Sequence, residues 1–405
     1  MLASVSLSAM TGESDCPPAA GISTPPVAIP ALRAERRPFD SIEPAEWDAL
    51  VDANPWSTPF SRWAMHRAWW DGYGANAHEE TLVVVPAGSA PGARPVGIMP
   101  LMHRHEVEPG DLARRTSIRH QDGAELTPVA PDAKAVFFGA SYHADYATLL
   151  AAPGDLAAVA EATADYLAHG GDPHHPAKWD AVDLRRLRCG DPAATALTAA
   201  FGRREHDCGW TTTVEQEDVC PVATLPLGGS IDDCLGLLGK KERHEIRRKV
   251  RRAEAVGEVR LDDSADPVAD LPAFIDLHQR RWGDLGLFPD TPGGDQSRVF
   301  ARRLFELFGT TGPLRLAFLT VGGRRIAAGI TFETADSIYY YNAGVDPDAR
   351  ELSPGVLMVE RYMRRALGRG IGRVDFLRGD EPYKYEWGAV NEPIQRVLVR
   401  RTGNR

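Results

Sequence analysis

The sequence predicts a mixed α/β protein built from two similar domains, and two observations lead to this fold class. The chain has 405 residues, which is more than one hydrophobic core usually fills. A predicted hairpin, TLVVVPA (81–87) and RPVGIMPLM (94–102), has a counterpart in LRLAFLTVG (314–322) and RRIAAGITFE (324–333). After each hairpin come a long helical pattern and a strand that ends in a Gly-Asp turn. We therefore expect a duplicated α-α-β-β-β-α-β unit.

The first half begins after a segment with little capacity to fold. Residues 1–35 are rich in Ala, Ser and Pro and are expected to form a disordered leader. Helices are predicted at 43–56, 59–74 and 154–171, the last ended by two glycines. A β-rich block lies between the second and third helices, and a strand follows at 179–187. We assign residues 36–215 to an N-terminal domain.

The second half, residues 216–405, repeats this order. Apolar side chains recur at helical spacing in 230–257, 271–286, 295–309 and 354–370. Strands are predicted at 314–322, 324–333, 337–345, 373–379 and 394–401. Because hairpins and a helix crossover contribute to the same sheet, the sheets should be mixed, which excludes a Rossmann fold and a closed barrel.

Composition narrows the class of protein. Hydrophobic residues make up 43% and charged residues 25% of the chain, and the formal net charge is −10, which argues against general nucleic-acid binding. The sequence has no apolar run long enough to span a bilayer and no secretory signal pattern, so we expect a cytoplasmic protein. The cysteines have no paired spacing, which disfavours a disulfide framework: Cys16, Cys189, Cys208, Cys220 and Cys234.

Several catalytic classes lack their motifs. The sequence contains no GxSxG elbow, and Gly239-Lys240 is not followed by the Ser or Thr of a phosphate-binding loop. His103 with His105, and His174 with His175, have no third ligand at metal-site spacing, so no metal is expected. Hydrolysis by a covalent or metal-assisted route is therefore disfavoured.

The strongest charge signal is KKERHEIRRKVRR (240–252), with a formal charge of +6. On a helix this segment would present one narrow apolar seam and a broad basic face. Arg247, Arg248 and Lys249 are candidate ligands for the phosphates of a cofactor, a nucleotide-linked substrate or RNA. The alternative is a solvated helix in a chain that uses Arg for most of its basic residues.

A second signal, DFLRGDEPYKYEWGA (375–389), follows the end of a predicted strand, where α/β proteins commonly bind substrates. Acyl transfer to an amine needs a donor near the developing oxyanion and a group that moves a proton. Lys384 could supply the first, and Asp380 or Tyr383 the second. Alternatively, Tyr383 and Trp387 pack together while Asp380 caps a short helix.

The junction between the strand at 337–345 and the helix at 354–370 supplies further candidates. Ser353 and Gly355 stand at a helix start, where free N–H groups bind phosphate. On the strand, Tyr340 and Asn342 should face the side opposite to their neighbours. We assign the following residues to substrate binding: Tyr340, Asn342, Arg378 and Trp387.

Together, KKERHEIRRKVRRAE, LHQRRWGDLG, the SPG helix start and DFLRGDEPYKYEWGA resemble the GNAT-superfamily acyltransferases of the CelD-like, cellulose-biosynthesis-associated branch, which are related to FemAB aminoacyl transferases. The resemblance implies tandem GNAT-like folds with a cleft. It also implies direct attack of an amine on a thioester or ester, with Arg247, Arg248, Tyr383 and Lys384 near the ligands. The usual R/Q-x-x-G-x-G/A signature is not reproduced in residues 346–355, a departure shared by the FemAB branch.

The leading hypothesis is an N-acyltransferase that moves an acyl group, most simply acetyl, from acyl-CoA to an amine of a sugar, an amino acid or a polysaccharide precursor. In this hypothesis Lys384 steadies the oxyanion and Asp380 or Tyr383 moves the amine proton. One alternative keeps the fold and takes the acyl group from aminoacyl-tRNA. Another is a non-catalytic binding module in exopolysaccharide assembly.

Overall fold

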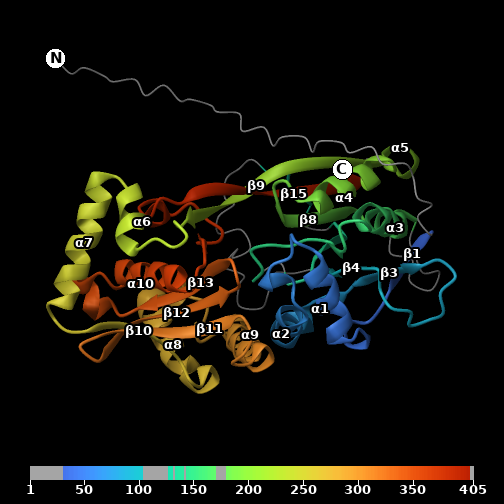
Figure 1. The fold of residues 1–405 in the computed structure, drawn as a ribbon. Helices are drawn as coiled ribbons and strands as arrows, with labels where there is room; N and C mark the ends of the chain where they lie inside the picture. Colours follow the sequence, from blue (N-terminus) through green and yellow to red (C-terminus); the bar gives the residue numbers. More distant parts are fainter. Residues whose placement is uncertain (1–30, 104–125, 131–132, 141–142, 170–178, 402–405) are drawn as a thin grey trace, which may run out of the picture.

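A computed structural model describes residues 31–103, 126–130, 133–140, 143–169 and 179–401. In it two halves lie side by side, with long strands running across both (Figure 1). The leader residues 1–30, Cys16, His105, His174 and His175 lie outside the described residues. No helix of the described part is both long and apolar enough to cross a membrane.

The N-terminal half runs from β1 to α5. Its helices are α1 (Pro44–Ala53), α2 (Trp63–Tyr73), α3 (Leu156–His169), α4 (Pro192–Gly202) and α5 (Glu205–Cys208). Its strands are β1 (Leu32–Arg36), β2 (His78–Glu79), β3 (Leu82–Pro86), β4 (Gly97–Met99), β5 (Leu101–His103), β6 (Ala135–Phe138), β7 (Leu150–Ala151) and β8 (Ala181–Arg188). Because β1 begins at Leu32, the predicted leader extends too far by four residues.

The C-terminal half runs from β9 to β15. Its helices are α6 (Ile231–Leu237), α7 (Lys240–Glu254), α8 (Pro267–Trp282), α9 (Pro292–Phe308), α10 (Pro354–Gly368) and α11 (Pro382–Tyr385). Its strands are β9 (Trp210–Thr224), β10 (Val259–Asp263), β11 (Leu314–Val321), β12 (Arg324–Glu333), β13 (Ser337–Val345), β14 (Arg373–Asp375) and β15 (Val390–Arg401). Strands β11 to β13 have nearly the predicted bounds, whereas β9 was not predicted.

One mixed sheet joins the halves. Its described strands follow the order β10-β11-β12-β13-β14-β9-β15-β8-β6-β5-β2, and a smaller sheet has the order β1-β3-β4-β7. In each half a helix crossover links two parallel strands: α10 lies between β13 and β14, and α3 lies between β6 and β8. This shared connection agrees with the predicted duplication. A domain boundary at residue 215 falls inside β9, so the halves share a strand.

Aromatic side chains pack the halves together beneath this sheet. The ring of Tyr73 on α2 lies 6.0 Å from that of Phe300 on α9, and Phe60 lies 5.2 Å from Phe332. Trp47 and Trp69 of the first half are fully buried. The burial of these large rings removes much apolar surface from water, which favours a fixed arrangement of the two halves.

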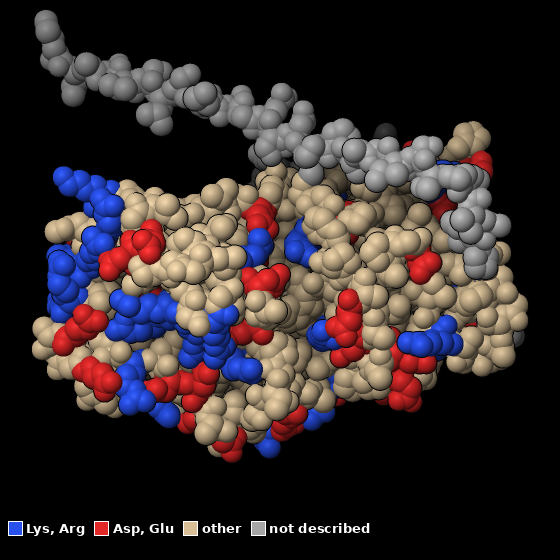
Figure 2. All heavy atoms as spheres, viewed as in Figure 1, with Lys and Arg blue, Asp and Glu red and all other residues tan. Residues whose placement is uncertain are grey.

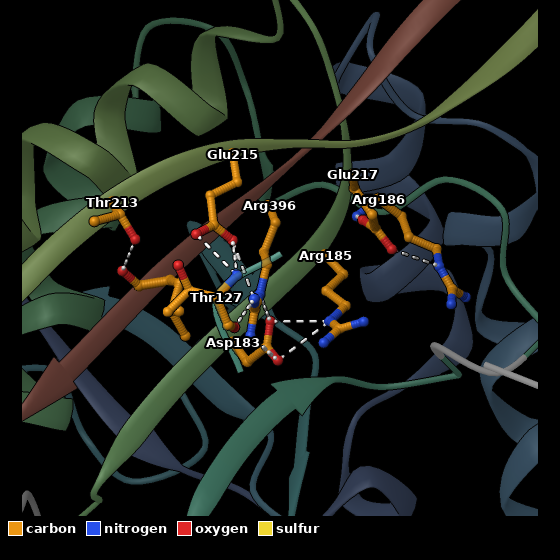
Figure 3. Close-up of polar contacts among 9 residues, drawn as sticks. Thr127, Asp183, Arg185, Arg186, Thr213, Glu215, Glu217 and Arg396 are labelled. Carbon is orange, nitrogen blue, oxygen red and sulfur yellow. Dashed lines mark hydrogen bonds and ion pairs between the residues drawn. The ribbon is translucent and has the colours of Figure 1, made fainter. Parts of the chain in front are cut away.

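Buried charges also join β8, β15 and β9 (Figure 3). The guanidinium of Arg396 is fully buried and donates two hydrogen bonds to Asp183, at 2.7 and 2.8 Å. It also donates to the carbonyl of Thr127 at 2.7 Å and to Glu215 at 3.1 Å. The charge of this arginine is thus balanced and its donors are well used, which is the condition under which a buried ion is tolerated.

The cysteines differ in state. Cys208, Cys220 and Cys234 are free thiols, of which the last two are buried. Cys189 is disulfide-bonded, a state that the spacing of the cysteines did not predict.

Candidate active site

A cavity of about 500 Å³ opens where β13 and β14 separate. β14 pairs with β13 only over Ser337–Tyr339, while β13 continues to Val345. The chain after β14 turns away, and both segments line the space that this leaves. Residues of both halves line the cavity, among them His143, Asp145, Tyr340, Asn342, Gly355, Arg378, Glu381, Tyr383, Lys384 and Trp387. The predicted substrate residues Tyr340, Asn342, Arg378 and Trp387 are therefore brought together.

A bulge in β13 changes which side chains reach the cavity. Asn342 stands opposite Ile330 of β12, but Tyr340 stands opposite Thr331, so β13 carries one extra residue here. A bulge of this kind breaks the strict alternation of side chains along a strand. As a result Tyr340, Tyr341 and Asn342 all line the cavity. The expectation that Tyr341 would face away from Tyr340 and Asn342 is wrong for this reason.

Lys384 lies in the cavity wall, but its ammonium is already fully engaged. It is buried, and its Nζ donates to the carbonyls of Leu377, Arg378 and Gly379 at 3.0, 2.9 and 3.0 Å. Glu381 pairs with the same ammonium at 2.8 Å. An ammonium has three donors, so none is left to polarise a substrate carbonyl in this arrangement. The contacts instead make Lys384 the residue that fixes the loop at 377–379.

That loop has an unusual backbone. Leu377 has a φ of 58° and Gly379 a φ of 105°, so two of its three residues lie in the left-handed region. Left-handed backbone costs free energy for a residue such as Leu and persists only where the surroundings impose it. The three carbonyls that converge on Lys384 supply such a restraint.

The two predicted proton-transfer residues differ in position. Asp380 is exposed and is not among the residues that line the cavity, so the structure does not bring it to the site. Tyr383 lines the cavity and is 38% exposed, and partial desolvation raises the pKa of its phenol, with smaller effects from Tyr340 and Glu381. Its hydroxyl therefore stays protonated at neutral pH and can donate a hydrogen bond to a ligand. Trp387 is buried in the cavity wall.

The start of α10 forms another part of the wall. Gly355 lines the cavity, and open space surrounds the position that a Cβ would occupy there. Ser353 is left-handed, with a φ of 56°, and its hydroxyl caps no amide of α10. Instead it accepts a hydrogen bond from Arg252 of α7 at 2.8 Å. Arg252 thus joins the end of the basic helix to the N-terminus of α10.

The other predicted anion ligands lie outside the cavity. Arg247 pairs with Asp232 at 2.7 Å and Arg248 with Glu245 at 2.8 Å, and neither they nor Lys249 line it. α7 forms one end of the molecule (Figure 1), and basic side chains gather over that end (Figure 2). The predicted seam of Ile246, Val250 and Ala253 is buried. The basic helix was therefore predicted correctly, and the ligand roles of Arg247, Arg248 and Lys249 remain predictions.

The N-terminal half supplies two cavity residues that were not predicted. Asp145 accepts a hydrogen bond from Nε of Arg378 at 3.1 Å. His143 is buried, and its Nε2 lies 2.7 Å from the hydroxyl of Tyr73. Tyr341 donates to the carbonyl of His143 at 3.1 Å. The only signal in the sequence was a polar His-Ala-Asp segment before an apolar strand, which is too common to assign a site.

Burial around these residues affects their protonation. The pKa of His143 is well below its usual range, chiefly because burial disfavours the charged ring and also because Arg186 is nearby. The pKa of Asp218 is raised to about 6, mainly by burial and against the opposing effect of Arg378. In the described part of the chain, no three His, Cys, Asp or Glu residues are grouped so as to hold a metal.

Part of the chain matches a known protein family. Residues 240–385 match the family model described as an acetyltransferase (GNAT) domain. The chain has a tandem GNAT-like fold. The matched segment runs from α7 to α11 and so contains the β13–β14 opening and the start of α10. Acyl transfer is the general reaction class that this match supports.

Solved structures resemble most of the chain. A crystal structure of FemX has 11% sequence identity and a TM-score of 0.53, covering 87% of this chain and 96% of its own. A conserved protein of unknown function from Bacteroides thetaiotaomicron VPI-5482 has 12% identity and a TM-score of 0.52, covering 89% of this chain and 98% of its own. At such identity the likeness concerns the fold. No curated protein matches the sequence.

Proposed function

We propose that this protein transfers an acyl group from acyl-CoA to an amine by direct attack. The observation that carries the proposal is the cavity between the separated ends of β13 and β14, which is bounded by the start of α10 and by Tyr383. A thioester donor lying along β13 would meet an amine entering from the side of the N-terminal half. The acceptor is an amine of a sugar, an amino acid or a polysaccharide precursor.

The start of α10 is the proposed site for donor phosphates. A helix N-terminus attracts anions through its free N–H groups and the helix dipole. Gly355 has no side chain, so a ligand can approach the backbone closely there. Arg252 is held near this helix start by the hydrogen bond that it donates to Ser353. Lys249 lies one turn before Arg252 on the same side of α7 and could reach the same anion.

The chemical step follows from the polar groups that line the cavity. The neutral amine nitrogen attacks the thioester carbon, the C–S bond breaks, and the thiolate takes the phenolic proton of Tyr383. Water takes the proton that the amine loses and returns a proton to the phenolate, so the enzyme is restored. Asn342 lines the cavity, and its side-chain amide could donate to the carbonyl oxygen as negative charge develops there. In this scheme Lys384 acts by holding the loop at 377–379.

A donor-binding experiment tests this proposal. Calorimetric titration of the full chain with coenzyme A, acetyl-CoA and a longer acyl-CoA should give saturable binding. Loss of a charged contact to phosphate should weaken binding by about tenfold or more in a variant with Lys249→Ala and Arg252→Ala. A matched variant with Arg247→Ala and Arg248→Ala, on the same helix, should bind nearly as well as the wild type.

The opposite ranking of the two variants would restore the sequence-based assignment of Arg247 and Arg248. A failure of all three ligands to bind would contradict an acyl-CoA donor.

An aminoacyl-tRNA donor is the second candidate, because one face of α7 remains open. Lys240, Lys241, Lys249 and Arg251 have no carboxylate within ion-pair distance among the residues that the structure describes. Contacts between such cations and phosphates weaken steeply with salt. Binding of tRNA that falls steeply between 50 and 200 mM salt, together with no binding of acyl-CoA, would favour this donor. The CelD-like branch, a cytoplasmic location and a role in exopolysaccharide synthesis remain parts of the proposal.

A further inference from the structure

Arg378 differs from the other cavity residues because it is a buried cation with unused hydrogen-bonding capacity. Its side chain is only 8% exposed. Nε donates to Asp145 at 3.1 Å, which uses one of the five guanidinium N–H donors. Nη1 is buried and has no hydrogen-bond partner among the described residues. Both Arg378 and Asp145 line the cavity.

A buried donor without a partner is costly, since it has lost its water and gained nothing in return. Such groups in native proteins call for an explanation, and a catalytic role and a bound water or ion are among the explanations. The guanidinium fork fits the two oxygens of a carboxylate or phosphate. The position of Arg378 in the cavity wall therefore suits an anionic group of the acceptor.

Asp145 lies beside this guanidinium and has the opposite charge. Its Oδ1 accepts from Arg378, and its Oδ2 forms no hydrogen bond within the described part of the chain. A cationic amine could bind that free oxygen. The cavity wall thus places a site for a cation next to a site for an anion, one from each half of the molecule.

We infer that the acceptor is an amine that also carries an anionic oxygen group close by, bound by Arg378 with the amine near Asp145. An α-amino acid and an amino-sugar phosphate both have this chemistry. The inference rests on the proposed acyl transfer and adds to it the class of acceptor. It also gives the N-terminal half a role in selecting the acceptor.

Asp218 offers an internal alternative. It is half-buried, its Oδ2 is also buried without a hydrogen-bond partner among the described residues, and its charge acts on Arg378. If Nη1 turned to Asp218 in solution, Arg378 would be a structural residue. In that case its replacement would change stability and leave the preference between acceptors unaltered.

The test compares acceptors that differ in one group, using the full chain and acetyl-CoA with detection of acylated product by mass spectrometry. L-lysine, L-lysinamide and cadaverine differ at the carboxylate, and glucosamine 6-phosphate and glucosamine differ at the phosphate. We expect at least a tenfold preference in kcat/KM for one acceptor that carries the anionic group over its counterpart that lacks this group, because a buried polar group left unpaired discriminates strongly. A preference within the lysine series would indicate a carboxylate, and a preference for glucosamine 6-phosphate over glucosamine would indicate a phosphate.

Variants then assign the preference to a residue. Arg378→Gln should abolish it, chiefly through KM for the anionic acceptor, and Arg378→Lys should retain part of it. The matched control is Arg281→Gln, which removes an exposed arginine from the same cavity and should leave the preference in place. Thermal melting and acetyl-CoA titration without any amine establish that each variant is folded and binds the donor.

Three results would overturn the inference. The first is equal use, by the wild type, of acceptors with and without the anionic group. The second is an unchanged preference in Arg378→Gln. The third is acylation only of amines that lack the anionic group, or of no amine in the panel. The wild-type comparison needs no variant, so it decides the matter even if Arg378→Gln does not fold. Absence of acetyl-CoA binding would instead count against the proposed function itself.

Discussion

Arg396 and Arg378 are similarly buried but differ in how many of their hydrogen-bond donors have partners. Arg396, between β8 and β9, is fully buried and donates hydrogen bonds to Asp183, Glu215 and Thr127. Arg378 is nearly as buried, yet among the described residues its side chain donates one hydrogen bond, to Asp145, and it lies in a cavity wall. Burial alone therefore does not identify a functional charge. The number of hydrogen-bond donors without a partner is the more informative quantity, because a buried ion with a structural role is tolerated only where its hydrogen bonds are made.

The largest effect should come from breaking the satisfied cluster. Replacing Arg396 with Leu leaves Asp183 buried without its main partner, which should lower the free energy of unfolding by about 3–5 kcal/mol. Urea denaturation followed by circular dichroism measures this change. Arg400→Leu is the control, since Arg400 lies on the same strand, is only half-buried and has no ion pair among the described residues. Equal midpoints for the two variants would refute a structural role for Arg396.

Lys384 resembles Arg396 because all of its donors are used in contacts within the protein. The sequence had instead suggested a direct catalytic role for Lys384. Lys384→Met removes the donor shared by three carbonyls and should lower both the free energy of unfolding, by about 2–3 kcal/mol, and kcat/KM. Tyr385→Ala on the same short helix, where the hydroxyl of Tyr385 bonds to Asn391, should affect both much less. A large loss of kcat in Lys384→Met with unchanged stability would point back to direct polarisation of the carbonyl.

Tyr383 lines the cavity together with Arg378, and its replacement tests the proposed proton donor. Tyr383→Phe should lower kcat by about a hundredfold, the usual contribution of a positioned acid, while leaving donor binding and stability nearly intact. Because the pKa of Tyr383 is raised above its ordinary value of 10.0, its proton should be retained up to at least pH 9. A wild-type kcat profile that falls with an apparent pKa between 8 and 9 and becomes flat in Tyr383→Phe would contradict this assignment.

The smallest effect should come from Asp218, next to Arg378. A carboxyl whose pKa is raised to about 6 binds more protons when folded than when unfolded between pH 4 and 6. Its contribution to stability is therefore favourable at low pH and is lost as pH rises through 6. Asp218→Asn should stabilise the protein at pH 7.5 by about 1 kcal/mol, after allowance for solvent screening, and by less at pH 4.5.

Urea denaturation at pH 7.5 and pH 4.5 measures this difference. Asp380→Asn is the matched control, since Asp380 is exposed and should have no comparable effect. A larger stabilisation at pH 4.5 than at pH 7.5 would show that the sign is wrong.

Much of the C-terminal half could be predicted from the sequence, because its elements carry strong local signals. The start of α10 followed from Ser353 and the proline after it, and β11 to β13 followed from apolar runs bounded by turns. β9 was missed because its middle, VEQED, lacks the apolar alternation of a half-buried strand. It forms a strand because it pairs along most of its length with β15, which lies far away in the sequence.

The sequence by itself determined the duplicated mixed fold, the basic helix α7, and the cavity residues Tyr340, Asn342, Arg378 and Trp387. These follow from periodicity, turn chemistry and charge, which are local properties. Only the tertiary structure decided that Lys384 is engaged by three carbonyls, that Asp380 stays in solvent, and that Asp145 meets Arg378. Hydrogen-bond satisfaction depends on atoms brought together by packing, and the last two residues are 233 positions apart.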